Sequence, residues 1–367
     1  MDWFASIVSS LNNVLWSYVL IGLLICVGLW FTFCTRFVQI TNVREMFRCV
    51  LEGSRTPRPE GHISPFQAFC ISTASRVGVG NIAGIAIAVV TGGPGAIFWM
   101  WVIATLGAAS GFIESTLAQI YKVKKPGGGF MGGPAYYIKN ALGSPFWAGV
   151  FAVLISVTYA LIFNSVQANT ISLSIETTTG LKPAYTGLIL AIVTGLVIFG
   201  GMTRIAKVAS FMVPFMAGAY LLLAFVVTCM NITEVPRVLL MIVTKAFSFD
   251  SITGAAIGVA LMTGIKRGLF SNEAGMGSAA IASACASTDS PARQGYISMT
   301  GVVVDTMLIC TVTGLAICCS GVLDSGAEGA ELTILAFRTV LGPLGGVFVS
   351  VAVTLFAFST ILGWEYQ

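Results

Sequence analysis

Residues 71–84 read ISTASRVGVGNIAG and place an arginine and a glycine-interrupted backbone inside an apolar stretch long enough to cross a membrane. Every backbone N–H and C=O group within hydrocarbon needs a partner, so a broken helix is tolerated only where protein, water or a ligand supplies one. A second stretch of this kind, TGIKRGLFSNEAGMGS, occupies residues 263–278. Because breaks that recur in two halves of a chain are typical of secondary transporters, the two stretches predict a substrate and ion site.

The composition is that of a membrane protein. Hydrophobic residues make up 56% of the chain and charged residues 9%, and its 41 glycines suit closely packed membrane helices. The fold class is therefore predicted to be an all-α polytopic membrane protein. No Walker A, H-E-x-x-H or G-x-S-x-G motif is present, which argues against ATP-driven transport and the commoner membrane hydrolases. The nine cysteines have no C-x-x-C spacing and are interpreted as membrane-buried hydrophobes.

Apolar windows of about 20 residues predict nine membrane spans. The second and the seventh are the interrupted ones. Residues 1–13 lack a basic region and a cleavage site, so the first span is predicted to be retained and not a signal peptide. Short interfacial helices are expected around Tyr136 and Tyr137 and over 326–340. The spans lie near 14–34, 65–91, 96–121, 147–173, 184–203, 206–230, 253–285, 294–320 and 343–365.

Basic residues set the predicted orientation. With the N-terminus outside, the cytoplasmic loops would hold twelve Lys and Arg residues and the outer loops four, a clear positive-inside bias. The prediction is a multi-pass protein of the cell membrane, whose net charge of +4 reflects topology and gives no reason to expect nucleic-acid binding. The cytoplasmic set is Arg36, Arg44, Arg48, Arg55, Arg58, Lys122, Lys124, Lys125, Lys139, Arg204, Lys207 and Arg293, and the outer set is Lys182, Arg237, Lys245 and Arg338.

Ionisable residues inside spans are functional candidates, since each costs roughly 2.5–3.5 kcal/mol at the bilayer centre on insertion scales. Glu114 and Asp305 could instead make helix–helix hydrogen bonds or lie nearer the interface. Lys266 and Arg267 could close a gate with Glu273 or simply brace unwound backbone. The full set is Arg76, Glu114, Lys266, Arg267, Glu273 and Asp305.

Two broken helices together suit a zwitterion. A half-helix N-terminus offers N–H groups to a carboxylate, and a half-helix C-terminus offers carbonyl oxygens to sodium or an ammonium group. Polar residues on two further spans could add ligands, because hydroxyls beside carbonyls make a plausible sodium site. Interhelical hydrogen bonding is the alternative for both sets. The sets are Phe163, Asn164 and Gln167, and Ser359, Thr360 and Trp364.

Five sequence blocks in order resemble the alanine or glycine:cation symporters, also called sodium/alanine symporters. They read GVGNIAG at 78–84, GGPGAIFWMW at 92–101, the stretch from Gly127 to Tyr137, GLFSNEAGMGS at 268–278 and FSTILGW at 358–364. The resemblance implies a LeuT-type fold, with two inverted five-helix repeats after one extra N-terminal helix. Residues 1–35 would be the extra helix, 65–230 the first repeat and 253–367 the second. The second repeat would lack its last two helices, which leaves about nine of eleven.

The resemblance also implies site residues. The substrate would lie against Ser75, Val77, Gly78, Asn81, Phe163, Gln167, Gly264, Gly268, Thr360 and Trp364, with Phe163 and Trp364 closing a small pocket. Sodium would be held by Ala74, Val77, Ser359 and Thr360, and the gating residues would be Arg76, Lys266, Arg267 and Glu273. No cofactor or metal beyond the coupling sodium is expected.

The main hypothesis is sodium-coupled symport of alanine or glycine into the cell by alternating access. A different class of function, suggested by the expected missing helices, is a non-transporting fragment or a binding or scaffolding subunit. A membrane enzyme is a third class, but Glu114, Glu273 and Asp305 have no evident nucleophile or metal partner in the sequence.

Overall fold

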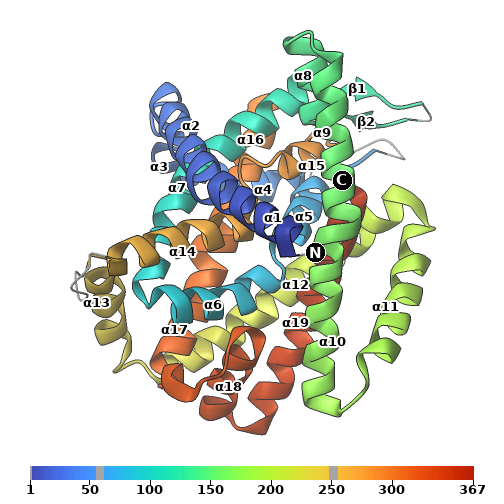
Figure 1. Ribbon diagram of the computed structural model, residues 1–367. Helices are drawn as coiled ribbons and strands as arrows, with labels where there is room; N and C mark the ends of the chain where they lie inside the picture. The colour runs from blue at the N-terminus through green and yellow to red at the C-terminus, as the bar shows by residue number, and fades with distance from the viewer. Residues whose placement is uncertain (1, 55–61, 127, 248–254) are drawn as a thin grey trace.

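The computed structural model describes residues 2–54, 62–126, 128–247 and 255–367, and the described chain is almost entirely helical (Figure 1). The predicted loop residues Arg55, Arg58 and Asp250 and the start of the third sequence block, Gly127, lie outside these ranges. A short antiparallel hairpin, β1 (Val123–Lys124) with β2 (Phe130–Met131), accompanies the helices.

Six helices in the described part are long and apolar enough to cross a membrane, and each coincides with a predicted span. The first begins at Asp2, well before the predicted residue 14. The three other predicted spans are α11 (Pro183–Ile198), which has 16 residues, and the two broken helices. The six are Trp3–Cys34 (α1 Asp2–Val14, η1 Leu15–Leu20, α2 Ile21–Cys34), Gly95–Ile120 (α7), Pro145–Thr179 (α9 Pro145–Val157, η3 Thr158–Phe163, α10 Asn164–Thr179), Gly201–Met230 (α12), Pro291–Cys319 (α16 Pro291–Val302, η4 Val303–Cys310, α17 Thr311–Cys319) and Pro343–Tyr366 (α19).

The first predicted break is confirmed. Helix α5 (Pro65–Arg76) begins with a capping box between Ser64 and Gln67 and a proline at its first turn. It ends at Arg76, and the chain runs through a single 3₁₀ turn, η2 (Val79–Asn81), before α6 (Ala83–Gly92). Gly78 takes an extended conformation at the break, with φ −129° and ψ −153°.

The second break lies several residues later than expected. Helix α14 (Ala255–Asn272) runs without interruption through Gly264 and Gly268, so within the stretch 263–278 the break does not fall at these two glycines of the predicted substrate site. A Cβ on Gly264 would meet the Ala96 carbonyl oxygen, and one on Gly268 would lie 2.5 Å from Ile103 Cγ2. The two glycines therefore let α14 approach α7 closely, and they remain helical.

The backbone turns instead at residues 273–277, before α15 (Ser278–Ala284). Glu273, Gly275 and Gly277 take positive φ values of 50°, 85° and 89°. Glycine adopts this left-handed region without a Cβ penalty, whereas Glu273 does so as a non-glycine residue. The break thus lies in the SNEAGMGS part of the block, residues 271–278, downstream of Gly264 and Gly268.

The two broken helices pair in opposite directions. Helix α5 packs on α15 and α6 packs on α14, so the first half of each broken helix lies beside the second half of the other. Helix α7 contacts α14 and α15, and α19 packs on α5, α10 and α12. This is the pairing that an inverted repeat requires, although the LeuT-type fold itself stays a prediction.

Smaller elements gather at opposite ends of the molecule (Figure 1). At one end lie α8 (Pro134–Ala141) and the hairpin, and at the other lie α13 (Val235–Ala246) and α18 (Gly329–Leu341). The predicted interfacial helices correspond to α8 and α18, while α13, α3 (Val38–Thr41), α4 (Val43–Gly53) and the 3₁₀ turn η5 (Leu323–Ser325) were not expected. Lys125, next to the hairpin, contacts Met202 in the first turn of α12.

Candidate functional site

Oxygen atoms converge where α19 crosses the first break. Thr360 Oγ1 lies 3.0 Å from the Ala74 carbonyl oxygen, 3.3 Å from that of Val77 and 2.9 Å from that of Phe356. Ser359 is also buried, and its hydroxyl donates to the Phe356 carbonyl at 2.9 Å. Three of the four predicted sodium ligands thus share one cluster, and Ser359 is adjacent to it in the chain.

Two amide side chains support the backbone of the first break. Asn81 Oδ1 accepts from the Gly78 N–H at 3.0 Å, and Gln167 Oε1 on α10 accepts from the Val79 N–H at 3.4 Å. A Cβ on Gly78 would lie 2.5 Å from Thr360 Oγ1 and 3.4 Å from Gln167 Nε2. Glycine at this position is therefore what allows α19 and α10 to approach the break.

Aromatic rings form one wall beside the break. Phe163 and Trp364 have ring centroids 5.2 Å apart, and Phe163 lies 5.7 Å from Phe270 of α14. Tyr159, on the same π-helical segment η3 as Phe163, stacks on it at 5.4 Å. The sequence predicted the pair Phe163 and Trp364, but it missed Phe270 and Tyr159, which only the spacing of Tyr159 four residues before Phe163 could have suggested.

Glu273 anchors this wall instead of pairing with a lysine. Its carboxylate accepts from Trp364 Nε1 at 2.8 Å and from the Ser278 hydroxyl at 2.7 Å. Lys266 donates to Ser17 Oγ in η1 at 2.7 Å. The suggested gate between Lys266 and Glu273 is therefore not formed in this structure, because each side chain has another partner.

The N–H groups of the second break are held by Glu114, which projects from α7. Its Oε1 accepts from the Gly275 N–H at 3.3 Å and its Oε2 from the Gly277 N–H at 3.1 Å. The sequence offered a helix–helix hydrogen bond as the alternative role for Glu114, and the observed bonds run to unwound backbone instead. A carboxylate suits this place, since it can accept several donors that helix geometry leaves unpaired.

Asp305 joins both broken helices from the π-helical segment η4. Its carboxylate accepts from Asn81 Nδ2 at 2.6 Å, from Ser271 Oγ of α14 at 2.7 Å and from Thr306 Oγ1 at 2.8 Å. Asn81 lies at the first break and Ser271 just before the second. Sequence reasoning singled out Asp305 and Asn81 separately but did not foresee that they are bonded.

The sodium:alanine symporter family model matches residues 1–367. The chain belongs to this family. Several relatives in it carry functional names. The probable sodium/glutamine symporter GlnT of Bacillus subtilis (strain 168) is 49% identical over 361 residues, covering 98% of this chain and 75% of that protein. The amino-acid carrier protein AlsT of the same organism is 45% identical over 367 residues, covering 100% and 77%. The sodium/alanine symporter AgcS of Methanococcus maripaludis is 39% identical over 371 residues, covering 99% and 82%.

Membership of the sodium:alanine symporter family establishes the coarse function. The chain is a multi-pass membrane protein of a sodium-coupled amino-acid symporter family, and its named relatives are transporters and not enzymes. These findings give no support to the alternative of a binding or scaffolding subunit. The names of the relatives differ in substrate, so the family alone does not choose between alanine and glutamine.

Arg76 of the symporter braces α5 against α16. Its guanidinium donates to the Ser298 carbonyl oxygen at 3.0 Å and to the Ser298 hydroxyl at 3.3 Å. A Cβ on Gly301 would lie 2.7 Å from Arg76 Nη1, so this glycine makes room for the side chain. These contacts are those of a structural support, and the gating role of Arg76 stays a prediction.

Lys266 and Arg267 of the symporter line a cavity of about 610 Å³ beside the aromatic wall. Phe163 and Phe270 form part of the same lining, and Trp16 of η1 contributes from the first helix. The cavity therefore ends at the rings that stand next to the first break. Gly264 and Gly268, which were expected in the substrate site, face α7 instead.

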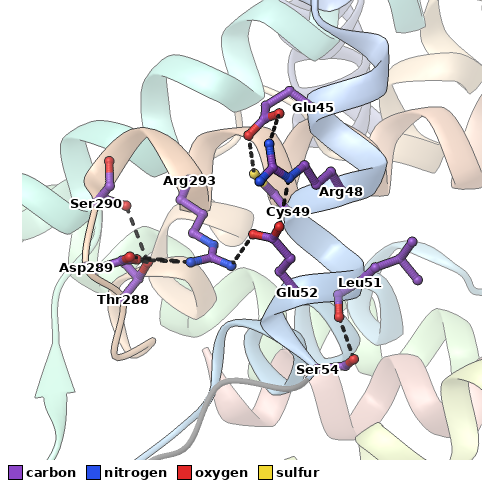
Figure 2. Close-up of polar contacts among 10 residues, drawn as sticks. All are labelled: Glu45, Arg48, Cys49, Leu51, Glu52, Ser54, Thr288, Asp289, Ser290 and Arg293. Carbon is purple, nitrogen blue, oxygen red and sulfur yellow. Dashed lines mark hydrogen bonds and ion pairs between the residues drawn. The ribbon is translucent and has the colours of Figure 1, made fainter.

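Charged residues link α4 to the start of α16 (Figure 2). Arg293 donates to Glu52 at 3.0 Å, and Glu52 also accepts from Arg48 at 2.7 Å. The pKa of Asp289 lies below its ordinary value, mainly because its own backbone N–H donates to the carboxylate, and Arg293 adds to this lowering. Burial, reinforced by Glu45, raises the pKa of the Cys49 thiol to about 11. These charged contacts hold α16, the helix whose Ser298 accepts from Arg76.

Proposed function

We propose that this symporter carries alanine or glycine into the cell together with sodium, by alternating access, and that both bind at the first break. The observation that carries the proposal is the contact of Thr360 Oγ1 with the carbonyl oxygens of Ala74 and Val77. These carbonyls belong to the C-terminal end of α5, where the helix dipole is negative and favours a cation.

Sodium is proposed to bind between α5 and α19. Hard cations prefer oxygen ligands, and this cluster offers backbone carbonyls and the hydroxyls of Thr360 and Ser359. Because Thr360 belongs to α19 and the carbonyls to α5, a sodium ion held by both would tie the two helices together. Closing that contact is the proposed step by which sodium prepares the substrate site.

The substrate carboxylate is proposed to face the N–H groups of Gly78 and Val79. Asn81 and Gln167 now accept from these donors, and they would also reach the bound amino acid. Phe163 and Trp364 are proposed to limit the length of the side chain, which favours alanine and glycine. Ser75, whose hydroxyl accepts from Gln367 Nε2 at 3.0 Å, completes the proposed set at the end of α5.

The end of the molecule with α8 and the hairpin is proposed to be cytoplasmic, because the basic loops gather there. The cavity lined by Lys266 and Arg267 would then lie on the outer side of the aromatic wall. These two side chains are proposed to line the path to the site and to gate it. Alternating access would move the first repeat, 65–230, against the second, 253–367.

The test is uptake of labelled alanine by proteoliposomes containing the full chain. An inward sodium gradient should drive accumulation, and unlabelled glycine should compete while longer amino acids should not. Uptake that does not depend on the sodium gradient would contradict sodium coupling. Competition by glutamine as strong as that by alanine would assign the second candidate substrate, which the name of the 49% identical relative suggests.

A further inference from the structure

The buried charges of the membrane region do not balance. Four charged side chains are buried among the described residues, with exposed fractions of 2% for Arg76, 7% for Glu114, 1% for Glu273 and 0% for Asp305. None of the three carboxylates lies within ion-pair distance of a basic group in the described chain. The one buried guanidinium bonds to Ser298 instead. Three ionised carboxylates against one guanidinium would leave two uncompensated negative charges in a medium that solvates them poorly.

We propose that Asp305 is a proton-binding site that couples pH to the contact between the two broken helices. The proposal rests on the proposed function, because it adds a second cation to a sodium-driven cycle. The step is a simple protonation, in which one carboxylate oxygen gains a proton from water and the side chain becomes neutral.

The hydrogen bonds around Asp305 allow both protonation states. The orientation of Asn81 is fixed, because its Oδ1 faces the Gly78 N–H and its Nδ2 must then donate to Asp305 Oδ1. The other oxygen, Oδ2, faces two hydroxyls, those of Ser271 and Thr306. A hydroxyl can donate to a carboxylate or accept from a carboxylic acid, so protonation at Oδ2 leaves no buried group unpaired.

Ser271 has a further partner that completes this exchange. Its Oγ lies 3.2 Å from Cys310 Sγ, and either atom can be the donor. When Asp305 is protonated it donates to Ser271, and the Ser271 hydroxyl turns to Cys310. When Asp305 is ionised, Ser271 donates to it. In both the protonated and the ionised state of Asp305, the polar groups of Asp305, Ser271 and Cys310 therefore have hydrogen-bond partners.

Glu114 lacks this freedom and serves as the comparison. Both of its oxygens accept from backbone N–H groups, which cannot reverse their role. Protonating Glu114 would place an O–H group against a fixed donor. The buried excess of negative charge is therefore removed more readily at Asp305 than at Glu114. Glu273 is intermediate, because one oxygen faces the fixed Trp364 donor and the other a hydroxyl of Ser278.

Helices α7, α14, α16 and α17 pack on η4, and their titratable residues are Glu114, Lys266, Arg267, Arg293, Tyr296, Cys318 and Cys319. Cys310 lies in η4 itself, with its Sγ 3.2 Å from Ser271 Oγ, whereas Arg76 bonds to Ser298 and Glu273 to Trp364 and Ser278. The titratable side chain of α7 is Glu114, which bonds to the second break. On α16, Arg293 contacts Glu52 and Tyr296 contacts Asn42, both away from Asp305. The groups in direct contact with the Asp305 carboxylate are therefore Asn81, Ser271 and Thr306.

Protonation should loosen the contact between the broken helices. Hydrogen bonds to a charged carboxylate are roughly twice as strong as those to a neutral group. In the ionised state, Asp305 holds Asn81 of the first break and Ser271 of α14 together. In the neutral state, both bonds weaken, and the two breaks can separate more easily.

The experiment measures sodium-driven alanine uptake as a function of pH in proteoliposomes. Wild type should show a titration in rate or apparent sodium affinity, and Asp305→Asn, which mimics the neutral acid, should flatten it several-fold while sodium still drives uptake. Glu114→Gln is the matched control and should retain the titration in whatever activity remains. A pH profile of Asp305→Asn that matches wild type would overturn the proposal.

Infrared spectroscopy of the purified wild-type protein gives an independent reading. A carboxylic-acid C=O band should titrate with pH, and Ser271→Ala should move its midpoint about one unit upward, because the bond that Ser271 donates to the charged carboxylate is stronger than the bond it accepts from the neutral acid. Absence of a titrating band, or an unmoved midpoint in Ser271→Ala, would overturn the proposal even if Asp305→Asn fails to fold. If wild type shows no sodium-driven uptake, the proposed function fails, and the spectrum still decides whether Asp305 titrates.

Discussion

The two breaks satisfy their backbone in opposite ways. The first presents carbonyl oxygens of Ala74 and Val77 to a hydroxyl and holds its N–H groups with neutral amides, Asn81 and Gln167. The second turns through three positive-φ residues and gives its N–H groups to a carboxylate from the neighbouring helix, Glu114. A neutral acceptor can be exchanged for a substrate carboxylate at little electrostatic cost, whereas a buried carboxylate next to the same donors would repel one.

The first and the second break therefore have different roles. The first break has the features of a ligand site, since its partners Asn81 of η2, Gln167 of α10 and Thr360 of α19 are all neutral. The second break is already saturated by the protein and supports the wall formed by Trp364 through Glu273. Apparent symmetry in the sequence therefore need not mean equal roles in binding.

The largest effect is expected from removing the carboxylate that supports the second break. Glu114→Ala would leave the Gly275 and Gly277 N–H groups unpaired, at about 1–3 kcal/mol for each. We expect a marked loss of thermal stability in detergent, measured by size-exclusion chromatography after heating, and loss of uptake. Glu331→Ala, at an exposed position of α18, is the control and should behave like wild type. A Glu114→Ala protein as stable as wild type would show that the second break does not depend on this residue.

A smaller loss of stability is expected from crowding the helix that precedes the second break. Gly264→Ala would push a methyl group against the Ala96 carbonyl and the Trp99 side chain, and overpacking typically costs about 1–3 kcal/mol. Gly258→Ala on the same helix meets nothing within 4 Å and should be neutral or slightly stabilising. Melting curves of the two variants measure this difference in stability. Equal melting temperatures would mean that Gly264 is not a packing residue and would reopen its place in the substrate site.

The next prediction concerns substrate selectivity at the first break. We expect the stability of the protein to be largely unchanged. Phe163→Ala would remove a ring from the wall that faces Trp364, so glutamine should compete with alanine about tenfold better than in wild type. Leu161→Ala, on the same helix with 66% of its surface exposed, is the control. Competition assays with both variants measure the change. Unchanged selectivity in Phe163→Ala would remove Phe163 from the pocket.

Periodicity and composition predicted much of the fold, because membrane spans and unwound backbone follow from the need to pair every backbone group. The first break was placed correctly, since Gly78 and Gly80 lie within the interruption between Arg76 and Ala83. The second was misplaced, because Gly264 and Gly268 look like helix breakers in sequence and only their contact with α7 reveals a packing role. The pairing of Asn81 with Asp305 joins residues 224 positions apart, which no single-sequence pattern could have indicated.

The central claim, that the first break holds sodium, is tested most directly by the sodium dependence of alanine uptake in Thr360→Val. Valine keeps the shape of threonine but removes the hydroxyl that meets Ala74 and Val77. The control is Thr354→Val on the same helix, whose hydroxyl bonds only within α19, to the Ser350 carbonyl at 2.9 Å. We expect sodium stimulation to be lost, or to need at least about tenfold more sodium, in Thr360→Val, equivalent to about 1.4 kcal/mol, and to be unchanged in Thr354→Val. Equal sodium dependence in the two variants and wild type would contradict the central claim.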